Sequence, residues 1–179
     1  MRFIPADLPG ILIVEPEIYG DMRGSFAELY HARVFAAAGI CAAFVQQNFS
    51  RSHRGVLRGM HYQVRHPQGK LIDVAMGEIF DVAVDLRRSS STCGQWTGVV
   101  LSSENHRQLW IPPGFAHGFY VLSEWAELRY LTTDYYTPEW ERTICWNDPD
   151  LSITWPLIGN TLPVVSEKDS QGQYLSMAD

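Results

Sequence analysis

Short segments in which hydrophobic residues alternate with polar ones recur along the chain, as expected of β-strands that bury one face. These segments are rich in β-branched and aromatic residues, and turn-forming residues separate them. They are ILIVEP (11–16), KLIDVAMGEIFDVAVDL (70–86), WTGVVLS (96–102), RQLWIP (107–112), GFYVLS (118–123) and LRYLTT (128–133). Several short strands divided by turns predict a β-sandwich or a β-barrel.

One segment has the composition of a helix. HARVFAAAGI, residues 31–40, combines an alanine run with Gly39 in the position of a C-terminal cap. Helices do not alternate with the predicted strands, so a parallel βαβ fold is disfavoured. The pattern predicts an all-β protein with one or a few short helices.

The segment 70–86 is divided by a glycine. One parity of this segment holds Ile72, Val74, Met76, Glu78, Phe80, Val82 and Val84. Gly77 interrupts the run, and glycine is typical of turns and bulges. The pattern predicts a hairpin of two antiparallel strands that reverses at Gly77.

The segment GVLRGMHYQ, residues 55–63, places a cation and a base on one predicted strand. Arg58 and His61 are three residues apart, so a regular strand would point them to opposite faces. A bulge at Gly59 or Met60 would turn both side chains into one concave interior. We therefore expect an irregularity at this point and a shared site.

Length and composition favour one domain over residues 1–179, because a chain of 179 residues that is 46% hydrophobic can bury one substantial core. No stretch approaches the roughly 20 apolar residues that span a bilayer. The start, MRFIPADLPG, lacks the apolar core of a secretory signal. We expect a cytoplasmic protein that does not enter a membrane. Three widely spaced cysteines without a CxxC pair indicate neither a disulfide framework nor a thiolate metal site.

Charge is distributed unevenly. The net charge of −6 argues against a general nucleic-acid or acidic-membrane binder, which requires a broad basic face. From Leu29 to Ile72, however, the chain has no Asp or Glu. The cations in that segment are Arg33, Arg51, Arg54, Arg58, Arg65 and Lys70. This segment is a candidate anion site, and solvated loop charges are the alternative.

Two further segments carry candidate chemistry. IPPGFAHGF, 111–119, places His117 among aromatic residues, and SEKDSQG, 166–172, places Lys168 and Asp169 in a polar stretch. Taken alone, a core histidine and a solvated loop explain them. Their combination with Arg58 and His61 favours a functional site.

Seven runs in this order resemble one family along nearly the whole chain, from near the first residue to about residue 175. They are GDMRGSFAE, QQNFSRSHRGVLRGMHYQ, QGKLIDVAMGEIFDVAVDLRRSS, LWIPPGFAHGFYVLSE, YLTTDYYTPEWER, WNDPDLSITWP and SEKDSQG. The sequence is similar to the dTDP-4-dehydrorhamnose 3,5-epimerases. The resemblance implies a jelly-roll, cupin-like β-sandwich and a homodimer whose N-terminal strands cross between subunits. It also implies a dTDP-4-keto-6-deoxyhexose substrate, inverted at C3 and C5 without any cofactor.

Inversion next to a ketone requires a base, an acid on the opposite side and a group that stabilises the enolate. The resemblance implies that His61 is the base and that the Asp169 carboxylate orients it. Tyr130 matches the acid, although an ordinary strand aromatic is its alternative. Lys70 matches the lysine near the keto oxygen. A histidine of ordinary pKa, about 6.5, is largely neutral at neutral pH, and a tyrosine of pKa about 10 keeps its proton.

The resemblance also implies a set of substrate-binding positions. They are Arg23, Phe26, Glu28, Gln46, Gln47, Asn48, Arg58, His117, Tyr135, Tyr136, Glu141 and Lys168. Arg58 and Arg23 suit the diphosphate, because guanidinium binds phosphate oxygens in bidentate fashion. Phe26 matches a residue that stacks on the thymine, in its own or the neighbouring subunit, with core packing as its alternative. Gln47 departs from the Asp or Asn more usual in the family, which affects one polar contact.

Three alternatives remain open at this point. A metal-dependent cupin would need a second histidine after His61, but the sequence reads His61-Tyr62-Gln63 and no Glu follows before Glu78. No metal ligand is therefore assigned. A non-catalytic sugar-binding sandwich would explain the strands but not the proposed acid and base. A mono-epimerase that inverts C3 or C5 alone, acting on a related ketosugar, has the same residue requirements.

Overall fold

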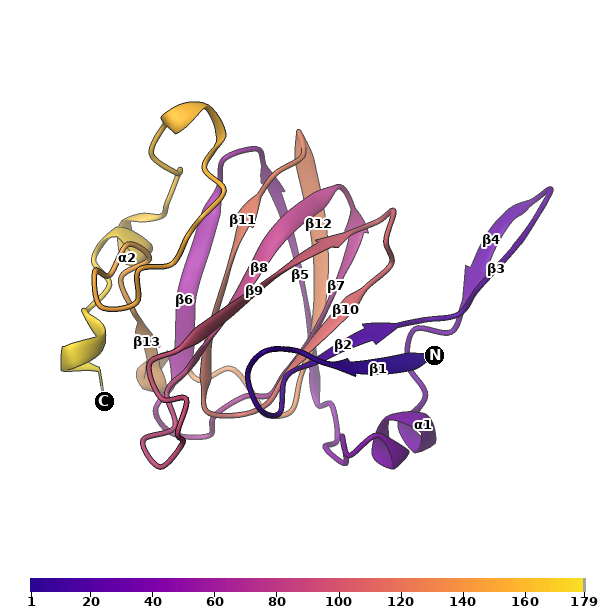
Figure 1. Cartoon of the computed structure of the whole chain (residues 1–179), viewed down its shortest axis with the longest axis horizontal. Helices are drawn as coiled ribbons and strands as arrows, with labels where there is room; N and C mark the ends of the chain where they lie inside the picture. Colours follow the sequence, from indigo (N-terminus) through magenta and orange to yellow (C-terminus); the bar gives the residue numbers. More distant parts are fainter. Residues whose placement is uncertain (179) are drawn as a thin grey trace.

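Two antiparallel β-sheets packed face to face form the body of the computed structural model, which describes residues 1–178 apart from the side chain of Asn160 (Figure 1). The six-stranded sheet has the order β1 (Arg2–Pro5), β2 (Leu12–Glu15), β10 (Gln108–Ile111), β7 (Lys70–Met76), β12 (Trp125–Thr132) and β5 (Gln46–His53). The five-stranded sheet has the order β13 (Glu141–Thr143), β6 (Leu57–Gln63), β11 (Phe115–Val121), β8 (Glu78–Asp85) and β9 (Trp96–Ser102). The predicted cupin-like β-sandwich is confirmed.

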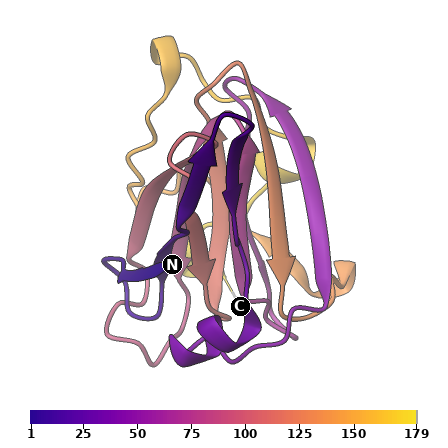
Figure 2. The same ribbon diagram turned by 90° about the vertical axis from the view of Figure 1, so that its right-hand side faces the viewer.

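The helices are short. They are α1 (Ala32–Ala37), α2 (Glu167–Ser170) and the 3₁₀ turns η1 (Pro138–Trp140), η2 (Ile158–Asn160) and η3 (Leu175–Met177). The predicted helix at 31–40 is therefore confirmed in a shorter form, and Gly39 follows its end with φ at +90°, where glycine is favoured. α1 lies at the lower end of both views (Figures 1 and 2). The buried Phe35 packs it against Val14 and Trp110.

Hydrophobic side chains from both sheets fill the space between them. Those of the six-stranded sheet include Ile72, Val74, Leu109, Ile111 and Leu128, and those of the five-stranded sheet include Ile79, Ala83, Leu101, Phe115 and Phe119. Burial of such side chains contributes about 1.5–3 kcal/mol each. This core holds the two sheets at a fixed separation, and the site opens beside it.

The chain after residue 143 covers the outer face of the five-stranded sheet. Leu151 and Trp155 are buried there against Leu57, Val82 and Val84. In Figure 1 this segment runs down the left side of the molecule, in orange and yellow, next to β6. The packing of this layer brings α2 against β6, which matters for the site.

The prediction of a hairpin at Gly77 is wrong. β7 and β8 join at this residue but belong to different sheets. A single linking residue is shorter than the two-residue loop of the tightest common hairpins, so the chain bends into the facing sheet instead. Gly77 has φ at +81°, and a Cβ there would lie 2.0 Å from the Trp125 carbonyl oxygen. The face that packs in the core changes with the sheet, from Ile72 and Val74 to Ile79 and Ala83.

A two-stranded hairpin projects from the body. β3 (Ile18–Asp21) and β4 (Gly24–Ala27) pair only with each other within residues 1–178, and they extend away from both sheets (Figure 1). Met22 at the tip is fully exposed and Phe26 is 70% exposed. The hairpin thus exposes apolar side chains and pairs with no other strand among the described residues. No helix in the described part of the chain is long and apolar enough to cross a membrane.

Candidate active site

A cavity of about 360 Å³ opens between the two sheets. This volume lies within the range of small-molecule sites. Its lining includes Gln46, Asn48, Arg58, His61, Gln63, Gln68, Lys70, His117, Tyr130, Tyr136 and Glu141. Nine of the sixteen residues expected at the site by the resemblance therefore meet in one cavity: Gln46, Asn48, Arg58, His61, Lys70, His117, Tyr130, Tyr136 and Glu141.

Arg58 and His61 both face this cavity although they are three residues apart on β6. The register between β6 and β11 shifts between them. His61 pairs with His117, while Arg58 pairs with Phe119, so three steps on β6 match two on β11. This is a β-bulge, and it contains the cis peptide Gly59–Met60. The predicted irregularity and the shared interior are confirmed.

Glycines are required where the bulge approaches β11. Gly59 has φ at +123°, and a Cβ on it would lie 2.6 Å from Gly118 Cα. A Cβ on Gly118 would lie 2.6 Å from Met60 Sδ. Larger residues at either position would push the strands apart and move the adjacent His61.

His61 is held by a carboxylate from the outer layer. Its Nε2 lies 2.6 Å from Asp169 Oδ1, and the Gly59 N–H donates to Asp169 Oδ2 at 3.2 Å. Asp169 lies in α2, whose first turn is capped by Ser166 Oγ, which accepts the Asp169 N–H at 3.1 Å. Burial alone would raise the pKa of Asp169, but the hydrogen bond with His61 and the bond from Gly59 outweigh it and lower the pKa. An ionised Asp169 holds the imidazole proton on Nε2 and leaves Nδ1 as the basic nitrogen.

Lys70 lies at the start of β7, on the opposite sheet, and is 9% exposed. Burial lowers the pKa of Lys70 to about 8, and the charges of Asp81 and Glu141 oppose this shift. The ammonium is therefore mostly protonated at neutral pH. Its burial strengthens its interaction with a nearby negative oxygen.

A second histidine–aspartate pair lies at the cavity wall, where His117 lines the cavity and the fully buried Asp81 does not. His117 Nε2 is 2.9 Å from Asp81 Oδ2 and 3.1 Å from Oδ1, and both residues are buried. Burial lowers the pKa of His117, with Asp81 acting in the opposite direction. This pair places a carboxylate near Lys70.

Tyr130 projects into the cavity from β12 of the six-stranded sheet, where it pairs with Asn48 and Ile72. Burial raises the pKa of Tyr130, and the nearby Arg58 opposes the shift. The phenol therefore keeps its proton and can donate it. Tyr130 and His61 face the cavity from opposite sheets.

A chain of polar contacts forms another wall. The Tyr136 hydroxyl donates to Glu141 Oε2 at 2.6 Å, and Lys168 pairs with the same oxygen. The bond to Glu141 raises the pKa of Tyr136 to about 12. Burial would raise the pKa of Glu141, but hydrogen bonds from Lys168 and Tyr136 prevail and lower it. Lys168 thus reaches the site through Glu141 rather than by lining the cavity.

Arg58 lines the cavity from β6. Its Nε donates to Ser52 Oγ on β5 at 2.9 Å. Its two terminal nitrogens have no hydrogen-bond partner within residues 1–178, which leaves a bidentate edge for an anion. Other cations of the acid-free segment lie elsewhere: Arg51 pairs with Glu127, and Arg65 covers the Trp140 ring.

Some of the expected substrate-binding residues do not line the cavity. Arg23 and Phe26 are on the projecting hairpin, where Arg23 pairs with Asp21. Glu28 follows that hairpin and is exposed. Gln47 is exposed and is not among the lining residues, although Gln46 and Asn48 on either side of it on β5 are.

Tyr135 is also outside the lining and is 62% exposed. Gln46 lines the cavity, but its amide is already bonded within the protein. Its Nε2 donates to Asn48 Oδ1 at 2.9 Å, and its Oε1 accepts the Tyr136 N–H at 3.0 Å. Gln46 therefore supports the wall as well as lining it.

Reasoning from the sequence did not single out three residues that line the cavity or bond to its lining: Asp81, Gln63 and Gln68. Asp81 had a usable signal, because an acid between Phe80 and Val82 in a predicted strand is a candidate buried charge. The glutamines had none, since their role depends on a loop that returns from β12.

The side chains do not form a metal centre. No group of three or more His, Cys, Asp or Glu side chains is placed to hold an ion among residues 1–178. His61 and His117 each bond a carboxylate instead, which occupies one nitrogen of each ring. The arrangement is suited to acid–base chemistry on an anionic ligand.

Comparison with known proteins gives a consistent result. The family model described as dTDP-4-dehydrorhamnose 3,5-epimerase matches residues 5–177. The protein of that name from Pseudomonas aeruginosa is 58% identical over 173 residues, covering 96% of this chain and 94% of that protein.

Solved structures agree with the family match. A crystal structure of dTDP-6-deoxy-D-glucose-3,5-epimerase from Legionella pneumophila in complex with dTDP-4-keto-L-rhamnose has a TM-score of 0.96 at 52% identity, covering 99% of this chain and 94% of that one. A 3'-monoepimerase from Streptomyces bikiniensis in complex with dTDP-quinovose has a TM-score of 0.89 at 32% identity, covering 96% and 87%.

Proposed function

The chain belongs to the dTDP-4-dehydrorhamnose 3,5-epimerase family, and we propose that it inverts C3 and C5 of dTDP-4-dehydro-6-deoxy-D-glucose to give dTDP-4-dehydro-L-rhamnose. The observation that carries this function is the placement of His61 and Tyr130 on opposite sheets around one cavity, with Lys70 beside them. No atom changes oxidation state overall, because each step exchanges one proton for another.

His61 is the proposed base. With Nε2–H held by Asp169, the lone pair of Nδ1 accepts the proton from the carbon next to the ketone. The same orientation logic operates in hydrolytic triads, where a carboxylate fixes the tautomer of the histidine. Asp169 is thus a positioning residue that acts through His61.

Lys70 is proposed to stabilise the enolate. The electron pair released from the C–H bond moves toward the keto oxygen, where a buried ammonium opposes the new negative charge. Tyr130 then donates its phenolic proton to the carbon from the other side. Because the acid and the base belong to opposite sheets, the proton returns to the face opposite to the one it left. Solvent restores both groups.

Arg58 is proposed to bind the diphosphate through its free terminal nitrogens. Lys168 and Glu141 support the hexose pocket together with Tyr136. His117 and Asn48 complete its polar lining. The cytoplasmic location stays a prediction from the sequence.

We also propose a homodimer in which the hairpin of one subunit completes the site of the other. The support is that Arg23 and Phe26, which match family substrate positions, lie on an exposed apolar hairpin away from the cavity of their own chain. Burying Met22 and Phe26 against a second copy would remove apolar surface from water.

Proton NMR tests the reaction. The purified protein is incubated with dTDP-4-keto-6-deoxyglucose in D₂O, and the C3 and C5 signals are followed separately. Loss of signal with inversion at both carbons is expected. Exchange at one carbon alone would identify a mono-epimerase, and absence of exchange would contradict the proposed function.

A mixing experiment tests the hairpin. One inactive variant carries His61→Asn, and the other carries Arg23→Ala with Phe26→Ala. If the hairpin acts across the dimer, mixed dimers contain one site with both a base and an intact hairpin, and activity returns toward half that of the wild type per mixed dimer. If the hairpin serves its own chain, no site in the mixture is complete and activity stays at the level of the single variants.

A mono-epimerase is the second candidate, because the Streptomyces 3'-monoepimerase shares this fold. Its identity of 32% is lower than the 58% and 52% of the two 3,5-epimerases. The comparisons therefore favour inversion at both carbons.

A further inference from the structure

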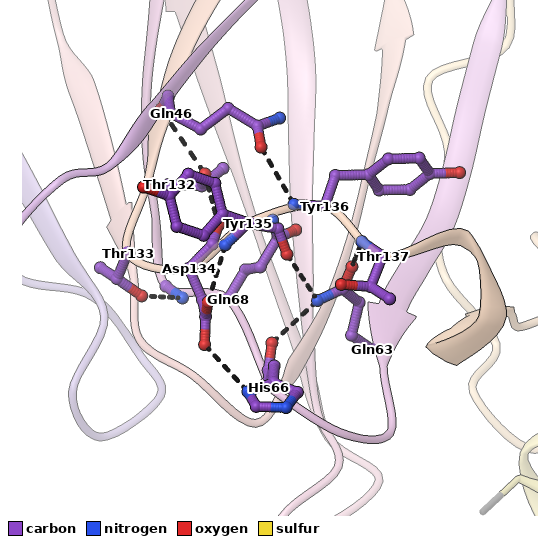
Figure 3. Close-up of polar contacts among 11 residues, drawn as sticks. Gln46, Gln63, His66, Gln68, Thr132, Thr133, Asp134, Tyr135, Tyr136 and Thr137 are labelled. Atoms are coloured by element: carbon purple, nitrogen blue, oxygen red, sulfur yellow. Dashed lines mark hydrogen bonds and ion pairs between the residues drawn. The ribbon is translucent and has the colours of Figure 1, made fainter.

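Three glutamine side chains fasten the loop that follows β12 (Figure 3). Gln46 accepts from the Tyr136 N–H, and Gln68 Nε2 donates to the Asp134 carbonyl oxygen at 2.8 Å. Gln63 makes the largest number of these bonds. The loop, residues 133–137, carries Tyr136 into the cavity wall.

The Gln63 amide is almost fully used. Its Oε1 accepts the Thr137 N–H at 2.7 Å. Its Nε2 donates to the His66 carbonyl at 2.8 Å and to the Tyr135 carbonyl at 3.3 Å. Gln63 is 6% exposed, so its amide is buried and these hydrogen bonds take the place of bonds to water.

Gln63 also connects this loop to the base. It lies two residues after His61 on β6, so strand alternation places the two side chains on the same face. β6 pairs with β13, where Gln63 is opposite Glu141, the acceptor of the Tyr136 hydroxyl. One buried amide therefore holds the backbone on both sides of Tyr136 against the strand that carries His61.

The substrate must be presented twice. A single base has to reach C3 and then C5, or the reverse, so the ring must be held in two poses between the same walls. Tyr136 forms one of these walls. A shift of the loop by a fraction of an ångström would change the two poses unequally, because the two carbons lie on different sides of the ketone.

We propose that Gln63 is a positioning residue for both epimerisations, acting through the 133–137 loop to fix Tyr136 relative to His61. This proposal rests on the proposed function, and neither the family model nor the names of the relatives assign it. Gln63 lines the cavity, but the hydrogen bonds of its amide all go to backbone groups of His66, Tyr135 and Thr137. Its loss should therefore alter the balance between C3 and C5 more than nucleotide binding.

Gln63→Glu is the sharpest variant. The carboxylate keeps an acceptor for the Thr137 N–H but cannot donate to the two carbonyl oxygens, and it places a charge against them. Gln95→Glu is the matched control, since Gln95 is exposed and lines neither this cavity nor the smaller one beside it. Folding is checked by thermal unfolding, and the assay follows deuterium entry at C3 and C5 by NMR together with kcat, KM and the Kd for dTDP.

Gln63→Glu is expected to lower kcat per folded molecule by about 10- to 100-fold and to change the C3:C5 exchange ratio at least about threefold. The Kd for dTDP should stay within about twofold of the wild type, because Arg58 is untouched. The proposal would be overturned if Gln63→Glu had the same exchange ratio and the same kcat as Gln95→Glu. It would also be overturned if the exchange ratio were the same in both variants and Gln63→Glu differed only in having a smaller folded fraction.

A variant that fails to fold does not end the test. Gln68→Glu removes one bond to the same loop, at Asp134, and should shift the exchange ratio in the same direction by a smaller factor. An unchanged ratio in that folded variant would overturn the proposal. A wild-type protein that exchanges neither carbon would instead refute the proposed function, which the same NMR series reports separately.

Discussion

The histidines of the two histidine–aspartate pairs lie side by side in the five-stranded sheet, and the pairs differ in access and in origin. His61 and His117 are direct partners in the register of β6 and β11. The His61 side chain is 28% exposed and lies 2.6 Å from Asp169, while that of His117 is 7% exposed and lies 2.9 Å from Asp81. Both histidines line the cavity, but His61 is the more exposed of the two and His117 is almost fully buried.

The origin of each carboxylate explains the difference. Asp81 comes from β8, the strand next to His117, so sheet formation alone creates that pair. Asp169 is 108 residues from His61 and arrives with the outer layer of the C-terminal segment. The accessible pair is the one that we propose to transfer a proton, whereas the carboxylate of the buried pair lies close enough to Lys70 to raise its pKa. A carboxylate beside a histidine therefore does not by itself identify a catalytic base.

Substituting the two histidines in turn gives the largest expected contrast. His61→Asn should lower kcat on the order of 10³-fold, because the base is lost, with little change in the unfolding midpoint. His117→Asn should instead reduce the free energy of unfolding by about 2 kcal/mol, since it leaves a buried carboxylate poorly paired. Activity is measured by exchange at C3 and C5, and stability by urea unfolding. Equal activity losses in the two variants would break the comparison.

The carboxylate of the accessible pair comes next. Asp169→Asn keeps the shape of the side chain, but an amide can offer its N–H to the ring and favour the tautomer with the proton on Nδ1. We expect kcat to fall about 10²-fold with the fold retained. Asp150→Asn, at an exposed position of the same outer layer, is the control. A pH–rate profile with an acid limb unchanged from the wild type would argue against any action of Asp169 through His61.

The sequence predicts the accessible pair better than the buried one. The roles of His61 and Asp169 were implied by the family resemblance, and the bulge that turns Arg58 and His61 together followed from an odd spacing next to a glycine. Asp81 was missed because the prediction for this segment used only the parity that holds Phe80 and Val82, and Asp81 lies on the other parity.

Parts of the fold also lay beyond the reach of local patterns. The switch of sheets at Gly77 depends on which strands the next segments pair with, and local alternation does not record this. β5 was not predicted, since QQNFSRSH has few apolar residues and becomes a strand by pairing with β12. The places of Arg23 and Phe26 relative to the cavity depend on a second chain.

The carboxylate of the buried pair is expected to act on stability and on Lys70. Asp81→Asn should lower the free energy of unfolding by about 2 kcal/mol, because a buried charge interaction is replaced by a weaker hydrogen bond. Since Asp81 raises the pKa of Lys70, its neutralisation should also move the basic limb of the kcat/KM profile to lower pH. Urea unfolding and pH–rate profiles of Asp81→Asn and of Asp73→Asn, a partly exposed carboxylate elsewhere on β7, test both effects. A basic limb at the same pH in Asp81→Asn and the wild type would show that Asp81 does not influence the Lys70 charge that acts in catalysis.

A change of pH alone is the smallest perturbation, and it tests the charge of Lys70, which Asp81 of the buried pair favours. The pKa of Lys70 is lowered from 10.5 to about 8 by burial, so its protonated fraction falls about tenfold between pH 7 and pH 9. If the ammonium stabilises the enolate, kcat/KM should fall about tenfold over this interval.

The free energy of unfolding should change in the opposite direction. Between about pH 8 and pH 10.5 the unfolded chain binds more protons at this site than the folded one, so the free energy of unfolding rises with pH, by about 1 kcal/mol from pH 7 to pH 9. Lys70→Met removes the titrating group. If Lys70 produces the pH dependence, this variant should lose both slopes, that of kcat/KM and that of the free energy of unfolding. We expect a buried cation that supports catalysis while it weakens the folded state. Equal slopes in Lys70→Met and the wild type would mean that another residue produces the basic limb of the kcat/KM profile.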